Sequence, residues 1–283
     1  MKHKQYRIFS LYIPLAILII FMLFPFYWII VTSLKTSQEI NGPVTYWPDK
    51  AVFTAYIKLF SGTVNFITAM KNSLIVASAT TVVSLFVSTL ASYAFSRYRF
   101  VGRKTLMILF LSNNMFPTVL LLLPLYSIMR NLGLLYTPTA LILSYTTFTI
   151  PFSVWLLNGF LNDLPGSLED AAMIDGATRG QAFIKIILPI LTPSLMATGV
   201  YIFMNAWNEY TFANMFTNNA SRTIPVALKS LIGQLGVQWD LLTAGGVVAV
   251  LPVCIMFFFA QKHFPFGKRP QARQYWLQLY LHT

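Results

Sequence analysis

Residues 9–31 read FSLYIPLAILIIFMLFPFYWIIV, a run without Asp, Glu, Lys, Arg or His. A helix needs about 20 predominantly apolar residues to cross a bilayer core that is about 30 Å thick, so this run is long enough to span a membrane. It is also longer than the roughly 7–15-residue apolar region of a signal peptide, and no small-residue cleavage site follows Ile30. We therefore interpret it as a transmembrane helix that is retained.

Five further stretches have the same apolar character. They cover residues 74–95, 106–128, 139–160, 195–216 and 243–260. Their apolar residues are continuous, whereas strands of a membrane barrel alternate polar and apolar residues. Several stretches contain proline, which a transmembrane helix tolerates, usually with a kink. We predict an all-α fold, an integral membrane bundle of about six transmembrane helices over residues 9–264, after a short N-terminus of residues 1–8.

The composition agrees with a membrane protein and excludes other classes. Of the 283 residues, 56% are hydrophobic and 10% are charged, whereas a soluble domain carries about 25% charged residues. The single cysteine, Cys254, excludes an intrachain disulfide and a site with several thiolate ligands. The three histidines, His3, His263 and His282, lie at or near the chain ends, so a histidine-based metal site is not expected.

Lysine and arginine are distributed unevenly between the connections. Thirteen of the 20 lie at the N-terminus, after the second and fourth stretches and in the tail: Lys2, Lys4, Arg7, Arg97, Arg99, Arg103, Lys104, Arg179, Lys185, Lys262, Lys268, Arg269 and Arg273. Because cytoplasmic loops carry an excess of these residues, we predict that both termini are cytoplasmic. The net charge of +12 follows mainly from this bias, and no segment is large enough to form a separate basic domain that binds nucleic acid.

The connection between the fourth and fifth stretches, residues 161–193, is unusually acidic for the cytoplasmic side. Four of the eight acidic residues of the chain lie between Asp163 and Asp175. Helices that rest on a membrane surface are usually rich in Lys and Arg. An acidic helix in this connection is therefore better suited to a protein partner than to the lipid surface.

The same connection carries signals for the ends of a short helix. Ser167 followed by Asp170 resembles a capping box. Glu169 and Asp170 then lie in the first turn, where carboxylates interact favourably with the helix dipole. Gly176 suits a left-handed helix end. We predict a short cytoplasmic helix that begins near Ser167 and ends near Gly176.

The stretch EDAAMIDGA at residues 169–177, with Phe183, Leu188-Pro189 and Pro193 downstream, resembles the EAA signature of the membrane subunits of ABC importers. Further stretches are similar to the carbohydrate-uptake branch of that family, which includes maltose-type G subunits: residues 116–117, 133–134, 207–210, 224–226 and 261–264. In this family the loop forms coupling helices that sit in a cleft of a cytoplasmic ATPase subunit. The resemblance implies ATPase contact for Glu169, Asp170, Ala171, Ala172, Asp175, Gly176 and Ala177.

The resemblance also implies partners and a location. The partners are a second, homologous permease subunit, an ATPase dimer and an extracytoplasmic solute-binding protein, and the location is the cytoplasmic membrane of a bacterium or archaeon. The chain has no Gly-x-x-x-x-Gly-Lys-Ser/Thr phosphate loop. It is therefore expected to be non-enzymatic and without a cofactor, with ATP and Mg²⁺ bound by the ATPase. Residues 265–283 form an atypical cytoplasmic tail, because members of this branch commonly end soon after the last span.

Polar residues within the predicted spans are candidates for the transport pathway. The candidates are Asn113, Asn114, Asn205, Trp207, Asn208, Glu209 and Tyr210. Glu209 is the only acid in a predicted span, and an ionisable group at membrane depth costs about 2.5–3.5 kcal/mol on insertion scales. It either belongs to the pathway, beside aromatic rings that suit a sugar, or makes a structural hydrogen bond. The asparagines either line a polar passage or pair across helices.

Two other function classes fit the sequence less well. A self-contained secondary transporter predicts several intramembrane carboxylates and internal repeats, but Glu209 stands alone and residues 1–140 show no convincing repeat in residues 141–283. A membrane-embedded enzyme predicts clustered catalytic residues, and the acids of residues 163–175 have no nucleophile or metal partner in the sequence. We predict the permease subunit of an ATP-driven importer for a sugar or oligosaccharide, and the chain does not define which sugar.

Overall fold

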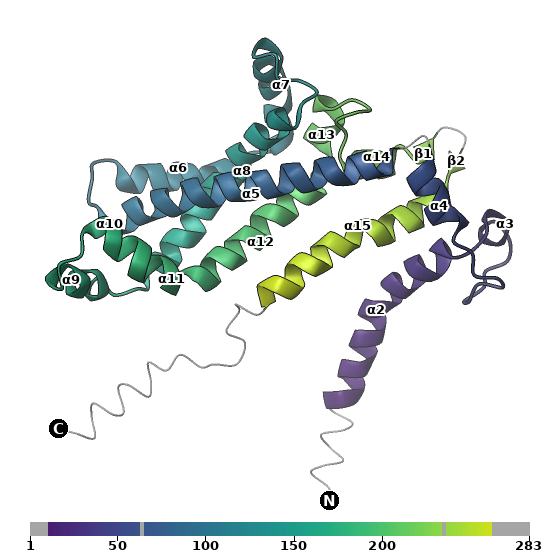
Figure 1. Cartoon of the computed structure of the whole chain (residues 1–283), viewed down its shortest axis with the longest axis horizontal. Helices are drawn as coiled ribbons and strands as arrows, with labels where there is room; N and C mark the ends of the chain where they lie inside the picture. Colours follow the sequence, from purple (N-terminus) through teal and green to yellow (C-terminus); the bar gives the residue numbers. More distant parts are fainter. Residues whose placement is uncertain (1–10, 63–64, 234–235, 262–283) are drawn as a thin grey trace, which may run out of the picture. The chain divides into compact units, whose positions relative to one another are not determined.

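The computed structural model describes residues 11–62, 65–233 and 236–261. The predicted N-terminus (residues 1–8) and the atypical tail (residues 265–283) lie outside these ranges. The described part is almost entirely helical (Figure 1). Its elements are α2 (Ile13–Ser33), α3 (Ser37–Ile40), α4 (Thr54–Ser61), α5 (Phe66–Arg97), α6 (Arg103–Met115), η2 (Thr118–Leu121), α7 (Leu122–Asn131), α8 (Pro138–Asn162), α9 (Ser167–Ile174), α10 (Arg179–Ala182), η3 (Phe183–Ile187), α11 (Leu188–Ile190), α12 (Thr192–Asn208), α13 (Thr211–Phe216), α14 (Ile224–Lys229), β1 (Ile232–Gly233), β2 (Gly236–Val237) and α15 (Trp239–Ala260).

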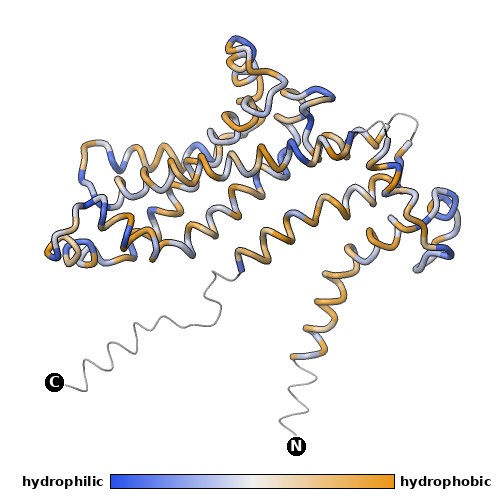
Figure 2. Tube along the Cα trace, viewed as in Figure 1, coloured by the Kyte–Doolittle hydropathy of each residue, from blue (hydrophilic) through white to orange (hydrophobic). Residues whose placement is uncertain are grey.

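Four helices are long and apolar enough to cross a membrane: α2, α5, α8 and α15. Two further pairs of helical segments pass the same test only together, so the described residues contain up to six spans if each bent pair counts as one. Figure 2 shows α2 and α15 as hydrophobic along nearly their whole length. The prediction of an all-α membrane bundle is confirmed, with two spans that are bent. β1 and β2 form a small antiparallel pair in which Ile232 faces Val237.

The third predicted span is bent. α6 ends at Met115, and the axis turns by 98° before η2 and α7. Phe116 is extended, with φ −80° and ψ 130°, because the ring of Pro117 disfavours a helical conformation for the residue before it. The span predicted over residues 106–128 is therefore bent at its proline, more sharply than an ordinary proline kink.

The fifth predicted span, residues 195–216, is also interrupted. α12 ends at Asn208, and α13 starts only at Thr211. The Glu209 carboxylate accepts hydrogen bonds from the backbone N–H groups of Phe212 (2.9 Å) and Ala213 (3.1 Å). Glu209 thus satisfies the free N–H groups at the start of α13, and a new helix begins where the apolar pattern alone predicted a continuation.

The chain forms two compact units, and the long acidic connection belongs to one of them. In that unit α5 packs closely against α8, because the small side chains of α5 let the two backbones approach. The hydroxyl groups of Ser84 and Thr149, both buried, lie 2.8 Å apart. A buried apolar cluster lies where these helices meet the connection: Tyr93, Leu157, Leu161, Ile187 and Leu191. Among the described residues, the unit comprises Ala77–Leu121, Ile142–Ala206 and residues 254–261.

The other unit is held together around the start of α5. The side-chain amide of Asn72 donates hydrogen bonds to the carbonyl oxygens of Ala220 (3.0 Å) and Arg222 (3.1 Å). The hydroxyl of Ser73 accepts a hydrogen bond from the N–H of Ile224 at 2.8 Å. These bonds fix the loop before α14 on α5. Its described residues are 11–62, 65–76, 122–141, 207–233 and 236–253.

Candidate functional site

α9 is a short helix within the acidic connection, and its start differs from the expected one. Gly166 is the N-cap residue, and no side chain caps the helix. The predicted capping box of Ser167 and Asp170 was wrong, because Ser167 is already the first helical residue. Glu169 and Asp170 do lie in the first turn, where their charges interact favourably with the helix dipole.

The end of α9 follows the expectation. Gly176 has a φ of +88°, in the left-handed region, which costs a glycine little because it lacks Cβ. The N–H of Gly176 bonds to the carbonyl of Met173 at 3.1 Å, and the N–H of Ala177 bonds to that of Ala172 at 2.9 Å. This pair of bonds is the Schellman motif. The turn reverses the chain directly after Asp175 and fixes the length of α9.

The capping box of this connection lies one helix later, at the start of α10. The hydroxyl of Thr178 accepts from the N–H of Gln181 at 3.3 Å, and the side-chain oxygen of Gln181 accepts from the N–H of Thr178 at 2.9 Å. α10 leads through the π-helical segment η3 into α11, and the axis bends by 73° before α12. The ring of Phe183 packs against the ring of Tyr93, with 4.5 Å between the two ring centroids. The connection therefore lies against α5.

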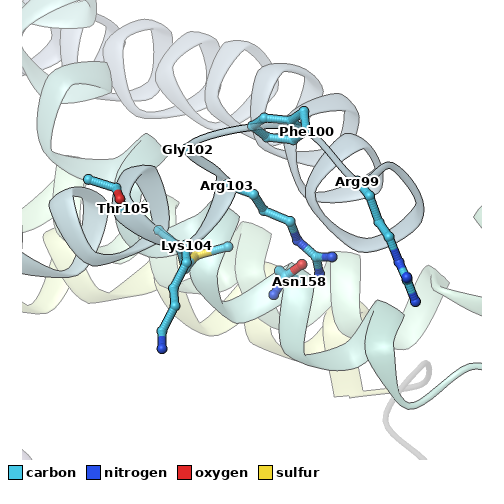
Figure 3. Close-up of a pocket in the computed structure, with 8 residues that line it drawn as sticks. Arg99, Phe100, Gly102, Arg103, Lys104, Thr105 and Asn158 are labelled. Atoms are coloured by element: carbon cyan, nitrogen blue, oxygen red, sulfur yellow. The ribbon is translucent and has the colours of Figure 1, made fainter.

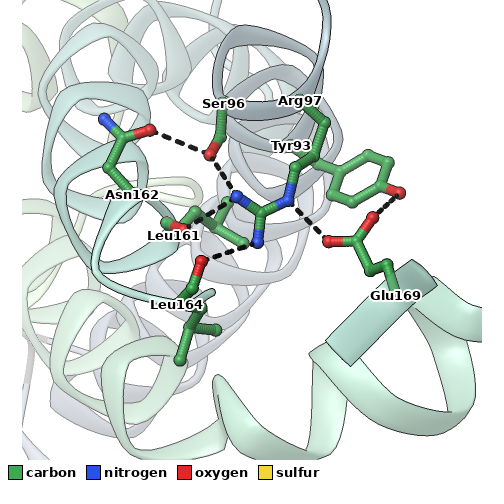
Figure 4. Close-up of polar contacts among 7 residues, drawn as sticks. All are labelled: Tyr93, Ser96, Arg97, Leu161, Asn162, Leu164 and Glu169. Carbon is green, nitrogen blue, oxygen red and sulfur yellow. Dashed lines mark hydrogen bonds and ion pairs between the residues drawn. The ribbon is translucent and has the colours of Figure 1, made fainter. Parts of the chain in front are cut away.

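Glu169 points from α9 into the protein, where its carboxylate has two partners (Figure 4). The residue is 5% exposed. Its Oε1 accepts a hydrogen bond from Nε of Arg97 at 2.5 Å, and this contact is an ion pair. Its Oε2 accepts a hydrogen bond from the hydroxyl of Tyr93 at 2.8 Å. Since a buried carboxylate needs a cation and hydrogen bonds to offset its lost hydration, α9 is anchored to the end of α5.

Arg97 also bonds to the end of α8 (Figure 4). Its remaining guanidinium groups donate to the carbonyl oxygens of Leu161 and Leu164, each at 3.2 Å, and to the hydroxyl of Ser96 at 3.2 Å. Ser96 in turn donates to the side-chain oxygen of Asn162 at 2.9 Å. The planar guanidinium thus joins α5, the end of α8 and α9. These bonds link α9 to two of the long helices, α5 and α8.

The other face of α9 is exposed. Leu168 is 37% exposed and Ile174 is 86% exposed, and Ala171 lies between them in the helix. Residues three apart on a helix share a face. These three residues are called the outer face of α9 below.

The residues that the sequence analysis assigned to ATPase contact fall into two groups. Asp170, Ala171, Asp175 and Gly176 are exposed. Glu169 and Ala172 are buried, and Ala177 is partly buried. The partners of Glu169, namely Tyr93 and Arg97, were missed. Arg97 had been counted only for its charge, although the predicted orientation already placed it on the same side of the membrane as α9.

Two of the pathway candidates bond within their own helices. The side-chain amides of Asn114 and Asn205 donate to the carbonyl oxygens of Phe110 and Tyr201, one turn earlier in their own helices. Asn113 is partly buried, Trp207 is buried, and Asn208 is exposed. Glu209 and Tyr210 are partly buried at the junction between α12 and α13. The hydrogen bonds of Glu209 described above agree with the structural alternative for this residue.

Comparisons with known proteins give one consistent family. Residues 84–269 match the family model described as "Binding-protein-dependent transport system inner membrane component". The sulfoquinovosyl glycerol transport system permease protein SmoH of Agrobacterium fabrum is 37% identical over 253 residues, which cover 89% of this chain and 88% of that protein. The trehalose/maltose transport system permease protein MalG of Thermococcus litoralis is 35% identical over 271 residues, 94% of this chain and 97% of that protein.

A solved structure has the same fold. A chain in the crystal structure of a bacterial ABC transporter involved in the import of the acidic polysaccharide alginate superposes with a TM-score of 0.77. The match covers 92% of this chain and 98% of that chain, with 23% sequence identity. At that identity the similarity concerns the fold alone.

Proposed function

We propose a function from the premise that the chain belongs to the family of inner membrane components of binding-protein-dependent transport systems. The chain is the permease subunit of an ATP-driven ABC importer that moves a sugar or oligosaccharide. The observation that carries the substrate class is the similarity, over most of both chains, to permeases named for sulfoquinovosyl glycerol and for trehalose and maltose. The chain itself does not hydrolyse ATP; a separate cytoplasmic ATPase pair does.

The family description also supports the partners and the location. A binding-protein-dependent system requires a solute-binding protein outside the membrane, and this chain pairs with a second, homologous permease subunit. The protein is a multi-pass component of the cytoplasmic membrane, with both termini in the cytoplasm. The distribution of Lys and Arg described above supports this orientation.

Coupling to the ATPase runs through the outer face of α9. Ile174 is 86% exposed on a helix that lies outside the apolar spans, and burying an isoleucine side chain contributes about 1.5–3 kcal/mol. The exposed carboxylates of Asp170 and Asp175 flank this face. The Schellman turn at Gly176 keeps the backbone compact where the partner approaches. The outer face is therefore the surface that docks into the ATPase.

Glu169 acts as a positioning residue in this mechanism. Its carboxylate is bonded to Arg97 and Tyr93 inside the chain, so it does not need the ATPase as a partner. When the ATPase pair closes on ATP, α9 moves with it, and the Glu169–Arg97 ion pair pulls on α5 and on the end of α8. This motion alternates the access of the pathway between the two sides of the membrane.

The pathway itself is proposed to include the polar side chains Asn113, Asn114, Asn205 and Asn208 and the aromatic rings of Trp207 and Tyr210. Amides offer donors and acceptors to sugar hydroxyl groups, and aromatic faces suit the apolar faces of sugar rings. Glu209 holds the junction of α12 and α13 in place. Its role here is to position its neighbours Asn208 and Tyr210.

The proposal is tested by co-purification and transport. The tagged chain is purified in a gentle detergent from cells that express the whole system, and the co-purifying proteins are identified. We expect an ATPase and a second permease from the wild type, and loss of the ATPase alone from Ile174→Asp. The control is Ile57→Asp, which places the same charge on another exposed isoleucine, 65% exposed on α4.

Two outcomes would overturn the proposal at different levels. If Ile174→Asp retains the ATPase and wild-type sugar uptake, the outer face of α9 is not the docking surface. If the wild-type chain purifies alone and takes up a sugar under an ion gradient without ATP, the chain is a secondary transporter.

A further inference from the structure

A basic hollow lies where α5 ends and α6 begins, in the same unit as α9 (Figure 3). Its volume is about 610 Å³. The residues that line it are Arg99, Phe100, Gly102, Arg103, Lys104, Thr105, Met107 and Asn158. The hollow carries three cationic side chains and no acidic one, and the proposed transport mechanism uses none of them.

The three cations have no anionic partner among the described residues. The ion pair recorded there joins Arg97 to Glu169, and the hydrogen bonds of the described side chains do not include those of Arg99, Arg103 or Lys104. Figure 3 shows Arg103 reaching toward Asn158, with Arg99 and Lys104 extended on either side. Like charges gathered without a counter-charge repel one another, so the hollow favours an anion.

The start of α6 adds to this preference. Gly102 is its N-cap residue with a φ of +86°, and neither a side-chain cap nor an acid in the first turn neutralises the free N–H groups. A helix N-terminus is the positive end of the helix dipole. Arg103 and Lys104 nevertheless occupy this first turn, where cations are unfavourable. An anion in the hollow would be attracted both by the cations and by the N-terminus of α6, and these attractions would offset the repulsion between them.

Asn158 also lines the hollow, and the residue is partly buried. Its side-chain oxygen is a buried atom with no hydrogen-bond partner among the described residues, although the amide faces into the hollow (Figure 3). A buried acceptor without a donor is costly. The missing partner is a hydrogen-bond donor, which a ligand hydroxyl group would supply beside Arg103, the side chain that reaches toward this amide (Figure 3).

The rim of the hollow is apolar and exposed. Phe100 is 40%, Val101 102% and Leu106 41% exposed. The hollow thus lies at the end of two membrane helices, with charged groups inside it and apolar side chains beside it. Basic pockets between membrane helices on the cytoplasmic side bind the head groups of anionic lipids.

We propose that this hollow binds the head group of an anionic phospholipid with a hydroxylated head group, such as phosphatidylglycerol. The phosphate lies among Arg99, Arg103 and the N-terminus of α6, and a head-group hydroxyl donates to the side-chain oxygen of Asn158. The acyl chains lie along Phe100 and Leu106. The lipid thereby fixes the connection between α5 and α6 next to the end of α5 that carries Arg97.

The test is native mass spectrometry of the full-length chain in detergent, titrated with phosphatidylglycerol, phosphatidylcholine or inorganic phosphate. We expect wild-type protein to retain phosphatidylglycerol in preference to phosphatidylcholine, with no displacement by phosphate at millimolar concentration. Each basic residue near an anionic surface contributes about 1 kcal/mol. The double variant Arg99→Gln/Arg103→Gln should therefore bind phosphatidylglycerol about 30-fold more weakly.

Two further variants keep the test decisive. Lys58→Gln/Lys229→Gln removes the same charge from exposed residues elsewhere and should bind like the wild type. Asn158→Asp leaves every cation in place, so membrane insertion is preserved, but it puts a competing carboxylate into the hollow and removes lipid binding.

Three results would overturn the proposal. They are equal weakening by the two double variants, wild-type binding by Asn158→Asp, and displacement of the lipid by inorganic phosphate. The first means a general charge effect, the second a site elsewhere, and the third a site for a soluble anion.

Discussion

Replacing Arg97 by methionine should release α9 from the bundle. Methionine keeps an unbranched side chain but removes the guanidinium. Two side chains, Arg97 and Tyr93, bond to the carboxylate of Glu169 in the structure, and the variant leaves only the hydroxyl of Tyr93. Glu169 is 5% exposed, so its charge stays buried. Removing one partner of a buried ion pair costs about 3–5 kcal/mol, because the other charge stays buried without compensation. The carbonyl groups of Leu161 and Leu164 lose their donor as well.

The cost falls on α9 more than on the whole protein. α9 can leave its place and hydrate Glu169, whereas the long helices stay packed. A loss of about 3–5 kcal/mol raises the equilibrium constant for local opening of α9 by at least about 10²-fold over the wild type. Hydrogen–deuterium exchange of the peptide over residues 167–177 should accelerate by this factor, while exchange in the middle of α8 changes little.

Two controls separate this effect from a general loss of charge. Arg179→Met removes a nearby cation that is exposed and makes no ion pair among the described residues, and it should leave α9 protected. Adding Glu169→Gln to Arg97→Met removes the stranded charge and should restore part of the protection, as a double-mutant cycle measures. If Arg97→Met exchanges like the wild type, or if the double variant is no better than the single one, the anchoring role of this ion pair is refuted.

Three further predictions concern single positions. Gly176→Val should abolish energised uptake, because φ at this position is +88° and a left-handed conformation costs a residue with a side chain about 1–2 kcal/mol. Membrane levels should stay normal, because nothing lies within 4 Å of the new Cβ. Uptake assays check this, with Gly176→Asn as the milder variant. Gly245→Ala should lower the thermal unfolding midpoint, because the new Cβ lies 2.6 Å from Leu228 and overpacking costs about 1–3 kcal/mol; Gly246→Ala, whose Cβ meets only Ile29 at 3.9 Å, should not. Glu209→Gln should keep most sugar uptake, because one acceptor oxygen for the backbone of α13 remains. Glu209→Ala should lower uptake, because α13 loses a cap worth about 0.5–2 kcal/mol. Wild-type uptake by the alanine variant, or complete loss of uptake in the glutamine variant, would contradict the structural role of Glu209.

The class of the fold could be predicted from the sequence because long uncharged runs have one physical solution in a bilayer. The ends and breaks of the spans were harder to predict from the sequence. The bend at Phe116 depends on Pro117, and proline occurs in both kinked and broken membrane helices, so its presence alone does not give a 98° turn. The interruption after Asn208 depends on a carboxylate that bonds to backbone groups three and four residues later, and hydropathy does not register such bonds.

The coupling connection shows the same limit at the level of single residues. The left-handed turn at Gly176 was predictable, since glycine is the residue that adopts this conformation readily. The capping box was assigned to the wrong helix, because Ser167/Asp170 and Thr178/Gln181 both have the required spacing and only the structure shows that Gly166 precedes the first helical residue. Arg97 was on the predicted side of the membrane, but twelve other basic residues were placed there too, and charge alone does not select among them.

The orientation of α9 is the strongest structural argument for its role. An isolated amphipathic helix would bury Leu168 and Ile174 and leave Glu169 in water, since burial of apolar side chains is favourable and burial of a charge is costly. The structure does the reverse: Ile174 is 86% exposed and Glu169 is 5% exposed. The inverted arrangement is stable because Arg97 and Tyr93 compensate the carboxylate, and it leaves the apolar face of α9 available to another protein. Turning α9 over would bury Ile174 but would break the bonds of Glu169 to Arg97 and Tyr93, so these bonds keep Ile174 on the surface where the proposed ATPase contact would bury it.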